Sequence, residues 1–189
     1  MKKLLIAIFC LLSPISFMNA QESAKEARTK LEAFQAKTGT VIIRGFSTIG
    51  TLRSPYNGTV TVESKEFTDA ISGRKEYGIT IEVKEAGRIE RENTSYIDYD
   101  EIDSLVKGID YIGKIDNTST KMKEFQADYR TKGDLMISTF SLNKEVMIAI
   151  SSGTIGKAST YFKLSSLAEI RDLIINAKAQ IDSIKQSSK

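Results

Sequence analysis

The chain has 189 residues, with 27 basic and 24 acidic side chains, one Cys and no His. The absence of His excludes His-dependent catalytic triads and His zinc ligands, and it removes the commonest general acid–base. The nearly balanced charge argues against nucleic acid as a partner, because proteins that bind nucleic acid usually carry a strong basic excess.

Residues 1–20 have the pattern of a secretory signal peptide. Lys2 and Lys3 precede the apolar run Leu4–Leu12, and small and polar residues lead to a predicted cleavage site after Ala20. The run is shorter than the about 20 residues that a membrane-spanning helix needs. Because Cys10 lies inside this run, the predicted mature chain has no Cys, and its 25 basic and 24 acidic residues leave a net charge of +1. We therefore expect an exported bacterial protein of the periplasm, the outer surface or the medium, with no transmembrane segment in the mature chain.

Residues 21–38 are predicted to form an N-terminal helix that ends before Gly39. Apolar residues recur at helical spacing among charged and polar ones: Ala24, Ala27, Leu31 and Phe34. This apolar stripe is thin and rich in Ala, so we expect the helix to pack weakly on the rest of the protein.

From Thr40 to Asp98 the apolar period changes to two, which is typical of strands. We predict four strands separated by turns that contain Gly, at residues 40–50, 59–64, 76–84 and 88–98. The third strand alternates most clearly, with one apolar face: Tyr77, Ile79, Ile81 and Val83. The fourth strand is polar and charged, which favours a place at the edge of a sheet.

Four carboxylates follow within six residues: Asp98, Asp100, Glu101 and Asp103. Next to them is the stripe of an amphipathic helix: Ile102, Leu105, Val106, Ile109 and Ile112. Acidic side chains are favourable at a helix start, so we interpret the cluster as a helix N-terminus with Asp100 as the N-cap or first residue. A calcium loop that starts at Asp98 would need Gly at its sixth position and Glu at its twelfth, where this chain has Asp103 and Ile109. Asp98, Asp100 and Asp103 are the alternative metal ligands, and no cofactor is predicted.

A second run of four strands is predicted at residues 124–132, 135–141, 145–152 and 158–164, with a hairpin turn at Leu142–Lys144. A long amphipathic helix follows at residues 165–185, where Ser166 and Glu169 have the spacing of a capping box. Gly108 and Gly113 interrupt the earlier helix, and we expect them to let it approach a sheet closely.

The predicted class is α+β, with antiparallel sheets, packed helices and the N-terminal helix, in one domain over residues 39–189. The halves 39–117 and 118–189 each read ββββα, which suggests a duplication. A shift of 65 residues places Tyr96 on Tyr161 and Ile97 on Phe162. A duplicated ββββα unit resembles, at the level of fold, the Whirly and Pur architectures that bind single-stranded nucleic acid. None of the motif residues of those families occurs here, so the resemblance implies no function.

Aromatic and basic residues supply the predicted ligand-binding face: Tyr96, Tyr99, Tyr129, Arg130 and Tyr161. The alternative interpretation places these tyrosines at the boundary between sheet and helix, with their hydroxyls in water. The leading hypothesis is an exported, non-enzymatic protein that binds an unidentified partner or small ligand. The alternatives are a lipid- or peptide-binding module of a sheet and a helix, similar to pleckstrin-like domains, and a carboxylate-dependent hydrolase. The sequence assigns no oligomeric state.

Overall fold

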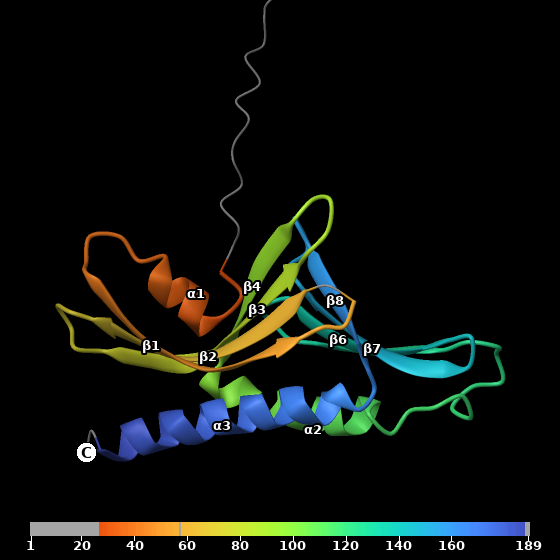
Figure 1. Cartoon of the computed structure of the whole chain (residues 1–189). Helices are drawn as coiled ribbons and strands as arrows, with labels where there is room; N and C mark the ends of the chain where they lie inside the picture. The colour runs from red at the N-terminus through yellow and green to blue at the C-terminus, as the bar shows by residue number, and fades with distance from the viewer. Residues whose placement is uncertain (1–26, 57, 188–189) are drawn as a thin grey trace, which may run out of the picture.

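The computed structural model describes residues 27–56 and 58–187 (Figure 1). It confirms the α+β class, with two antiparallel four-stranded sheets and packed helices. The first half contains β1 (Ile42–Arg53), β2 (Thr59–Asp69), β3 (Lys75–Glu85), β4 (Arg91–Asp98), a 3-10 turn (Tyr99–Glu101) and α2 (Ile102–Ile112). The second half contains β5 (Gln126–Arg130), β6 (Leu135–Leu142), β7 (Glu145–Ser152), β8 (Ala158–Lys163) and α3 (Ser166–Ser187). The short helix α1 (Lys30–Gln35) precedes both halves.

Each sheet is a meander in which neighbouring strands follow one another along the chain, in the orders β1-β2-β3-β4 and β5-β6-β7-β8. The polar strand β4 lies at an edge of the first sheet, as its charges predict. The turn between β6 and β7 has positive φ at Asn143 and Lys144, which is the backbone of a tight two-residue hairpin. These local signals explain why the strand order is readable from the sequence.

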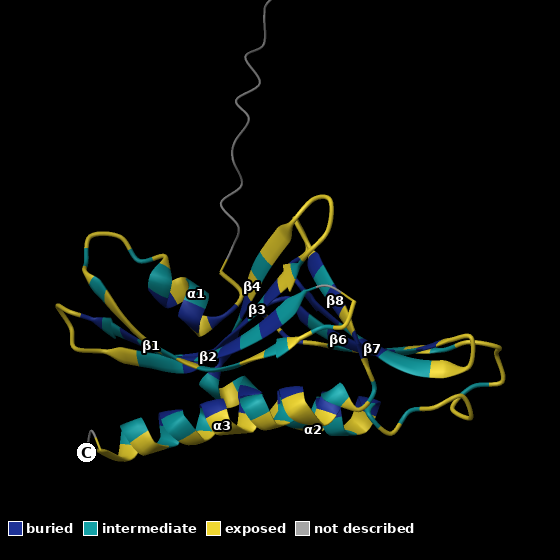
Figure 2. Cartoon of the chain, in the orientation of Figure 1, coloured by how far each residue is buried: buried dark blue, intermediate teal, exposed yellow. Residues whose placement is uncertain are grey.

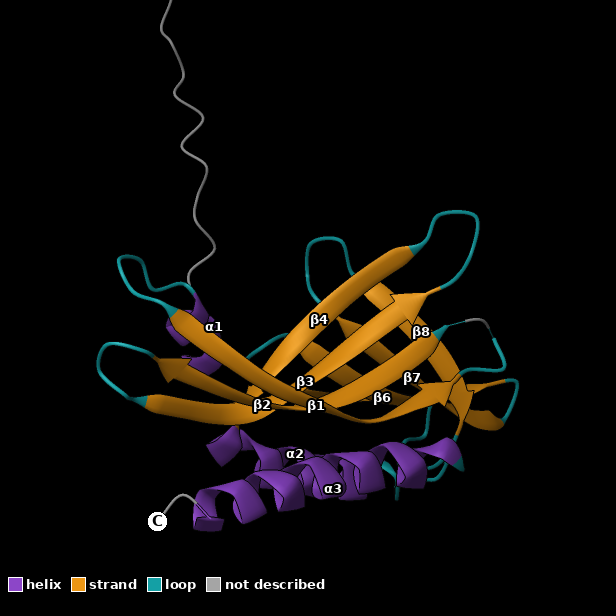
Figure 3. Ribbon diagram, turned by 60° about the vertical axis from the view of Figure 1, so that its left-hand side comes forward, coloured by secondary structure: helices purple, strands orange, loops and turns teal. Residues whose placement is uncertain are grey.

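Each of the two long helices, α2 and α3, packs on the sheet of the other half. Helix α3, from the second half, packs against β1, β2 and β3 of the first sheet, whereas α2, from the first half, packs against β5 and β6 of the second sheet. Both helices lie on the same side of the molecule and contact each other (Figures 1 and 3). Each half therefore uses the other half's helix to cover part of its sheet.

One apolar core joins both sheets and both helices. Fully buried residues of β3, such as Ile79 and Ile81, belong to the same cluster as Ile137 of β6, Ile109 of α2 and Ile174 of α3. Of the residues that a shift of 65 aligns, Ile97 and Phe162 are both fully buried, whereas Tyr96 is half-buried and Tyr161 is exposed. Figure 2 shows buried residues along the strands that lie over α2 and α3 and at intervals along α3 itself.

Helix α1 differs from the prediction in two respects. It covers only Lys30–Gln35, because Thr29 is extended and caps it through a capping box with Glu32. The predicted positions 21–26 lie outside the described residues. The expected weak packing is wrong, because Leu31 and Phe34 are buried with Phe67 of β2 in a second core cluster. Helix α1 lies on the face of the first sheet opposite α3 (Figure 1).

The predicted starts of α2 and α3 also differ from the observed ones. Helix α2 begins at Ile102 after a 3-10 turn, so Asp100 is neither its N-cap nor its first residue, and no side chain caps it. Helix α3 begins with Ser166 inside the helix, so this residue is not the N-cap of the capping box predicted with Glu169. The predicted close approach at Gly108 is confirmed, because a Cβ atom there would clash with the ring of Tyr129.

The predicted signal peptide, residues 1–20, lies outside the described residues. Among the helices that the structure describes, none has both the length and the apolar character to cross a membrane.

Candidate functional site

The acidic cluster at the end of β4 is divided among separate structural contacts. Asp98 is buried, and its two carboxylate oxygens accept the backbone N–H groups of Lys30 (2.9 Å) and Leu31 (3.1 Å). These are the first N–H groups of α1, which have no hydrogen-bond acceptor within the helix. Asp98 therefore supplies acceptors to the start of α1 and not to the start of α2, the helix that follows it in the sequence.

The other carboxylates of the cluster point to different neighbours. Asp100 pairs with the Lys30 ammonium at 2.6 Å, and Asp103 pairs with Lys178 of α3 at 2.6 Å. Glu101 accepts the backbone N–H of Lys132 at 2.9 Å. Within residues 27–56 and 58–187 no group of three or more His, Cys, Asp or Glu side chains is arranged to hold a metal ion. The cluster thus connects the end of β4 to α1, to α3 and to the turn between β5 and β6.

The candidate tyrosines near β4 serve two different contacts. The Tyr96 hydroxyl donates to Gln35 Oε1 of α1 at 3.1 Å, and its ring packs on the small core around α1. The Tyr99 hydroxyl donates to Asp182 of α3, and the Lys185 ammonium lies 3.6 Å from the centre of the Tyr99 ring. The hydrogen bond to Asp182 raises the pKa of Tyr99, and partial burial adds to this shift.

The remaining candidates lie on the second sheet. Tyr129 is half-buried against α2, and this burial raises the pKa of its hydroxyl. Arg130 is exposed, with a nitrogen 3.2 Å from the sulfur of Met136. Tyr161 is half-exposed and makes an edge-to-face contact with Phe140, with ring centres 6.2 Å apart. The predicted binding-face residues therefore lie in different surroundings: Tyr96 contacts α1, Tyr99 contacts α3, Tyr129 contacts α2, and Tyr161 lies on β8. Their side chains line no common cleft among those found in the described part of the chain.

A cleft lies where the strands of the first sheet end, and sequence reasoning did not find it. It has a volume of about 640 Å³ and extends from the β1–β2 turn to the β3–β4 hairpin. The register of the sheet aligns four of its residues in one row across β1, β2, β3 and β4: Arg53, Thr59, Lys84 and Glu92. Because directly opposed residues point to the same face, these side chains gather on the side of the sheet away from α3.

A second row lies two residues further along the same face: Thr51, Thr61, Glu82 and Thr94. The Thr51 and Thr61 hydroxyls are hydrogen-bonded at 3.0 Å. Figure 1 shows that α1 covers the far end of this face and leaves the end with the cleft uncovered. The sheet therefore presents a polar, partly exposed surface rich in Thr that leads into the charged cleft.

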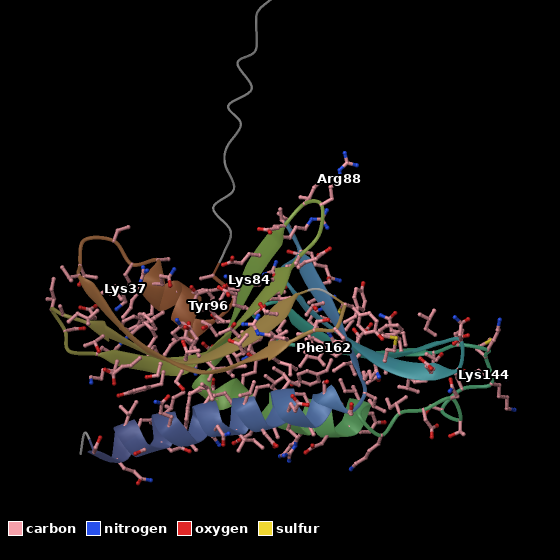
Figure 4. All side chains as sticks on the ribbon, in the orientation of Figure 1. Lys37, Lys84, Arg88, Tyr96, Lys144 and Phe162 are labelled. Carbon is pink, nitrogen blue, oxygen red and sulfur yellow. The ribbon has the colours of Figure 1, made fainter. Side chains whose placement is uncertain are left out.

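Charges of both signs line the cleft, and some are already neutralised. Lys84 lies 3.2 Å from Glu82 and 3.2 Å from Glu92, while Glu85 accepts the backbone N–H of Ser159 in β8 at 3.1 Å. Burial raises the pKa of Glu82, and its hydrogen bond with Glu92 adds to the rise; Lys84 lowers the pKa of Glu92. Figure 4 shows Lys84 on the ribbon of the first sheet among these polar side chains.

Two charged side chains of the cleft remain available. Within the described chain, Arg53 and Glu90 have no ion-pair partner, although both line the cleft. A guanidinium and a carboxylate that are not neutralised by the protein can bind charged or strongly polar groups. The cleft therefore offers donors, acceptors and both signs of charge to a ligand.

A scan of the chain against protein-family models gives no match, and a search of curated proteins finds no related sequence either. The functional argument accordingly rests on the geometry of the site.

Proposed function

We propose that this protein is an exported, non-enzymatic binding protein that takes a small polar ligand or a charged segment of a partner in the cleft at the end of the first sheet. One observation supports this proposal: the row Arg53, Thr59, Lys84 and Glu92 opens into a cleft of about 640 Å³ in which Arg53 and Glu90 have no ion-pair partner among residues 27–56 and 58–187. This volume is in the usual range for small-molecule sites.

Export is part of the proposal and rests on the sequence pattern of residues 1–20. A periplasmic, surface or secreted location follows from that pattern. It is tested by expressing the full chain in a bacterium, separating the compartments and determining the first residue of the exported form. A start at Gln21 outside the cytoplasm supports the proposal, and an unprocessed chain in the cytoplasm contradicts it.

Ligand binding is tested with two matched Trp substitutions in β2. Thr59→Trp fills the cleft, whereas Thr68→Trp makes the same change at the other end of the strand. Wild type and both variants are titrated with amino acids, dipeptides, dicarboxylates and sugar phosphates, and chemical shifts and the melting temperature are followed. We expect at least one of these probe classes to bind wild type and T68W but not T59W. Absence of binding by all four classes, or equal binding by T59W, contradicts the proposal.

A second candidate function is carboxylate-dependent hydrolysis, because the Glu82–Glu92 pair has pKa values shifted in opposite directions. Such a separation is a feature of acid–base pairs in active sites. It ranks second because Lys84 and Glu92 are half-exposed, so water is not excluded from the pair. Turnover in a broad hydrolase panel that Glu82→Gln abolishes, while Glu63→Gln leaves it intact, would favour this function over simple binding.

A further inference from the structure

Three hairpin ends meet at the end of the molecule that carries the cleft. The β7–β8 loop contacts β4, because Asn93 Nδ2 donates to the carbonyl of Ile155 at 3.4 Å. The β1–β2 turn is fastened to β8 by the Ser54 hydroxyl, which donates to the carbonyl of Tyr161 at 2.5 Å. These bonds tie the β7–β8 loop to β4 and the β1–β2 turn to β8, so strands of both sheets connect the hairpins.

Each of these ends exposes one large apolar side chain. Tyr56 of the β1–β2 turn is 49% exposed, Ile89 of the β3–β4 loop is 69% exposed, and Ile155 of the β7–β8 loop is 90% exposed. Figure 2 shows the β3–β4 loop as an exposed projection beyond the sheet. Apolar side chains on separate convex loops do not form the continuous surface that a stable protein–protein interface needs.

A cation lies close in sequence to each apolar tip: Arg53, Arg88 and Lys157. None of the three has an ion-pair partner among the described residues, whereas Glu85 and Glu92 of the same region are occupied by Ser159 and Lys84. Figure 4 shows Arg88 pointing away from the rest of the protein. Lys84 is shared by Glu82 and Glu92, and Arg91 pairs with Glu85, so the five basic side chains of this end exceed its four acidic ones by one. The excess of positive charge lies at the tips, on Arg88 and Lys157.

We infer that these hairpin tips dock on the surface of an anionic lipid bilayer. Tyr56, Ile89 and Ile155 insert into the boundary between headgroups and acyl chains, where separate apolar side chains on convex loops can each be buried. Arg53, Arg88 and Lys157 then lie at the level of the anionic headgroups. This surface shares Arg53 with the cleft, whereas its other residues, Tyr56, Arg88, Ile89, Ile155 and Lys157, lie outside the cleft lining.

The test is sedimentation with vesicles of phosphatidylcholine alone or with about a third phosphatidylglycerol. The chain used begins at Gln21, because the apolar run Leu4–Leu12 would bind lipid by itself, while every residue of both core clusters lies within the chain retained. We expect binding to the anionic vesicles that is at least tenfold tighter than to the neutral ones and that weakens in high salt.

Paired variants separate the insertion of side chains from charge. The double variant Ile89→Ser, Ile155→Ser is expected to weaken binding to anionic vesicles about tenfold or more. The double variant Arg88→Ser, Lys157→Ser is expected to weaken it about fivefold for each charge removed. Ile71→Ser is the matched control, because Ile71 is also an exposed Ile in a turn but lies at the opposite end of the first sheet.

The inference is overturned if the chain binds both vesicle types equally, if it binds neither, or if I71S weakens binding as much as the tip variants do. The variant T59W separates this inference from the proposed function, because it is expected to lose soluble probes and to retain vesicle binding. A melting curve for each variant confirms that it is folded before binding is compared.

Discussion

The two halves of the molecule have the same order of elements but contribute differently to the fold. Helix α2 has 11 residues and α3 has 22, which correspond to lengths of about 17 Å and about 33 Å. The longer helix reaches across β1, β2 and β3 of the other half, whereas the shorter one covers only β5 and β6. Helix α1 is added to the outer face of the first sheet alone. A shared order of elements therefore does not imply that each half is a separate structural unit.

The largest expected effect comes from dividing the chain between the halves. A fragment of residues 21–117 would lack α3, which covers the apolar residues of β2 and β3, including the fully buried Val62 and Ile81. We expect this fragment alone to be unfolded, as judged by poorly dispersed NMR spectra. Mixing it with residues 118–189 should restore dispersion. A well-dispersed spectrum of the isolated first half would show that α3 is not needed for the folding of this half.

A smaller effect is expected at the contact between α2 and the second sheet. Gly108→Ala would raise helix propensity by about 1 kcal/mol, but the added methyl group would clash with the ring of Tyr129. We expect a net loss of stability of up to about 2 kcal/mol in chemical denaturation, because overpacking costs about 1–3 kcal/mol and the propensity gain offsets about 1 kcal/mol of it. In a Tyr129→Ala background the same change should become stabilising. Stabilisation in the wild-type background would mean that α2 does not approach β5 this closely.

Helix α1 provides the next comparison, because only the first half carries it. Asp98→Ala removes the acceptor of two backbone N–H groups at the start of α1, and we expect a loss of about 1–2 kcal/mol. Asp100→Ala is the matched control, because its ion pair with Lys30 is exposed and such pairs contribute about 1 kcal/mol or less. Equal losses in urea denaturation of the two variants would contradict the capping role of Asp98.

The smallest effect concerns the pH dependence at the other end of α1. Lys37 holds the pKa of Asp69 well below its usual range, together with hydrogen bonds from Thr40 and two backbone N–H groups. A lowered folded-state pKa means that this contribution is fully present above about pH 4, where Asp is ionised in the unfolded chain, and is lost as pH falls. The difference in melting temperature between wild type and Asp69→Asn should therefore be largest at pH 7 and shrink progressively as the pH falls below about 4. A constant difference would exclude this linkage.

The fold class and most strands were predictable because their signals are local. The alternation through Ile79, Ile81 and Val83 and the stripe of Ile102, Leu105 and Ile109 each depend on neighbours within a few residues. The start of α1 was also readable, since Thr29 and Glu32 have the spacing of a capping box. The prediction placed the start earlier because Ala24 and Ala27 extend the helical spacing.

Contacts between distant parts of the chain were not predictable in the same way. The acidic cluster was assigned to the start of the helix that follows it, but Asp98 binds Leu31 at the start of α1, which lies 67 residues earlier. The row of Arg53, Lys84 and Glu92 comes from three strands, and only the register of the sheet aligns these residues. A single sequence does not contain that register, so the cleft was missed and the tyrosines, which are conspicuous one by one, were chosen in its place.

The position of α3 also has a consequence for the order in which the protein can be assembled. Its residues leave the ribosome after β1, β2 and β3 and after the whole second sheet, and until they emerge the apolar surface of β1, β2 and β3 has no permanent cover. Completion of the native state must therefore wait for contacts between elements that are more than a hundred residues apart in the sequence, which is the situation in which folding is slow. If the chain is exported, this delay keeps it unfolded during translocation across the inner membrane.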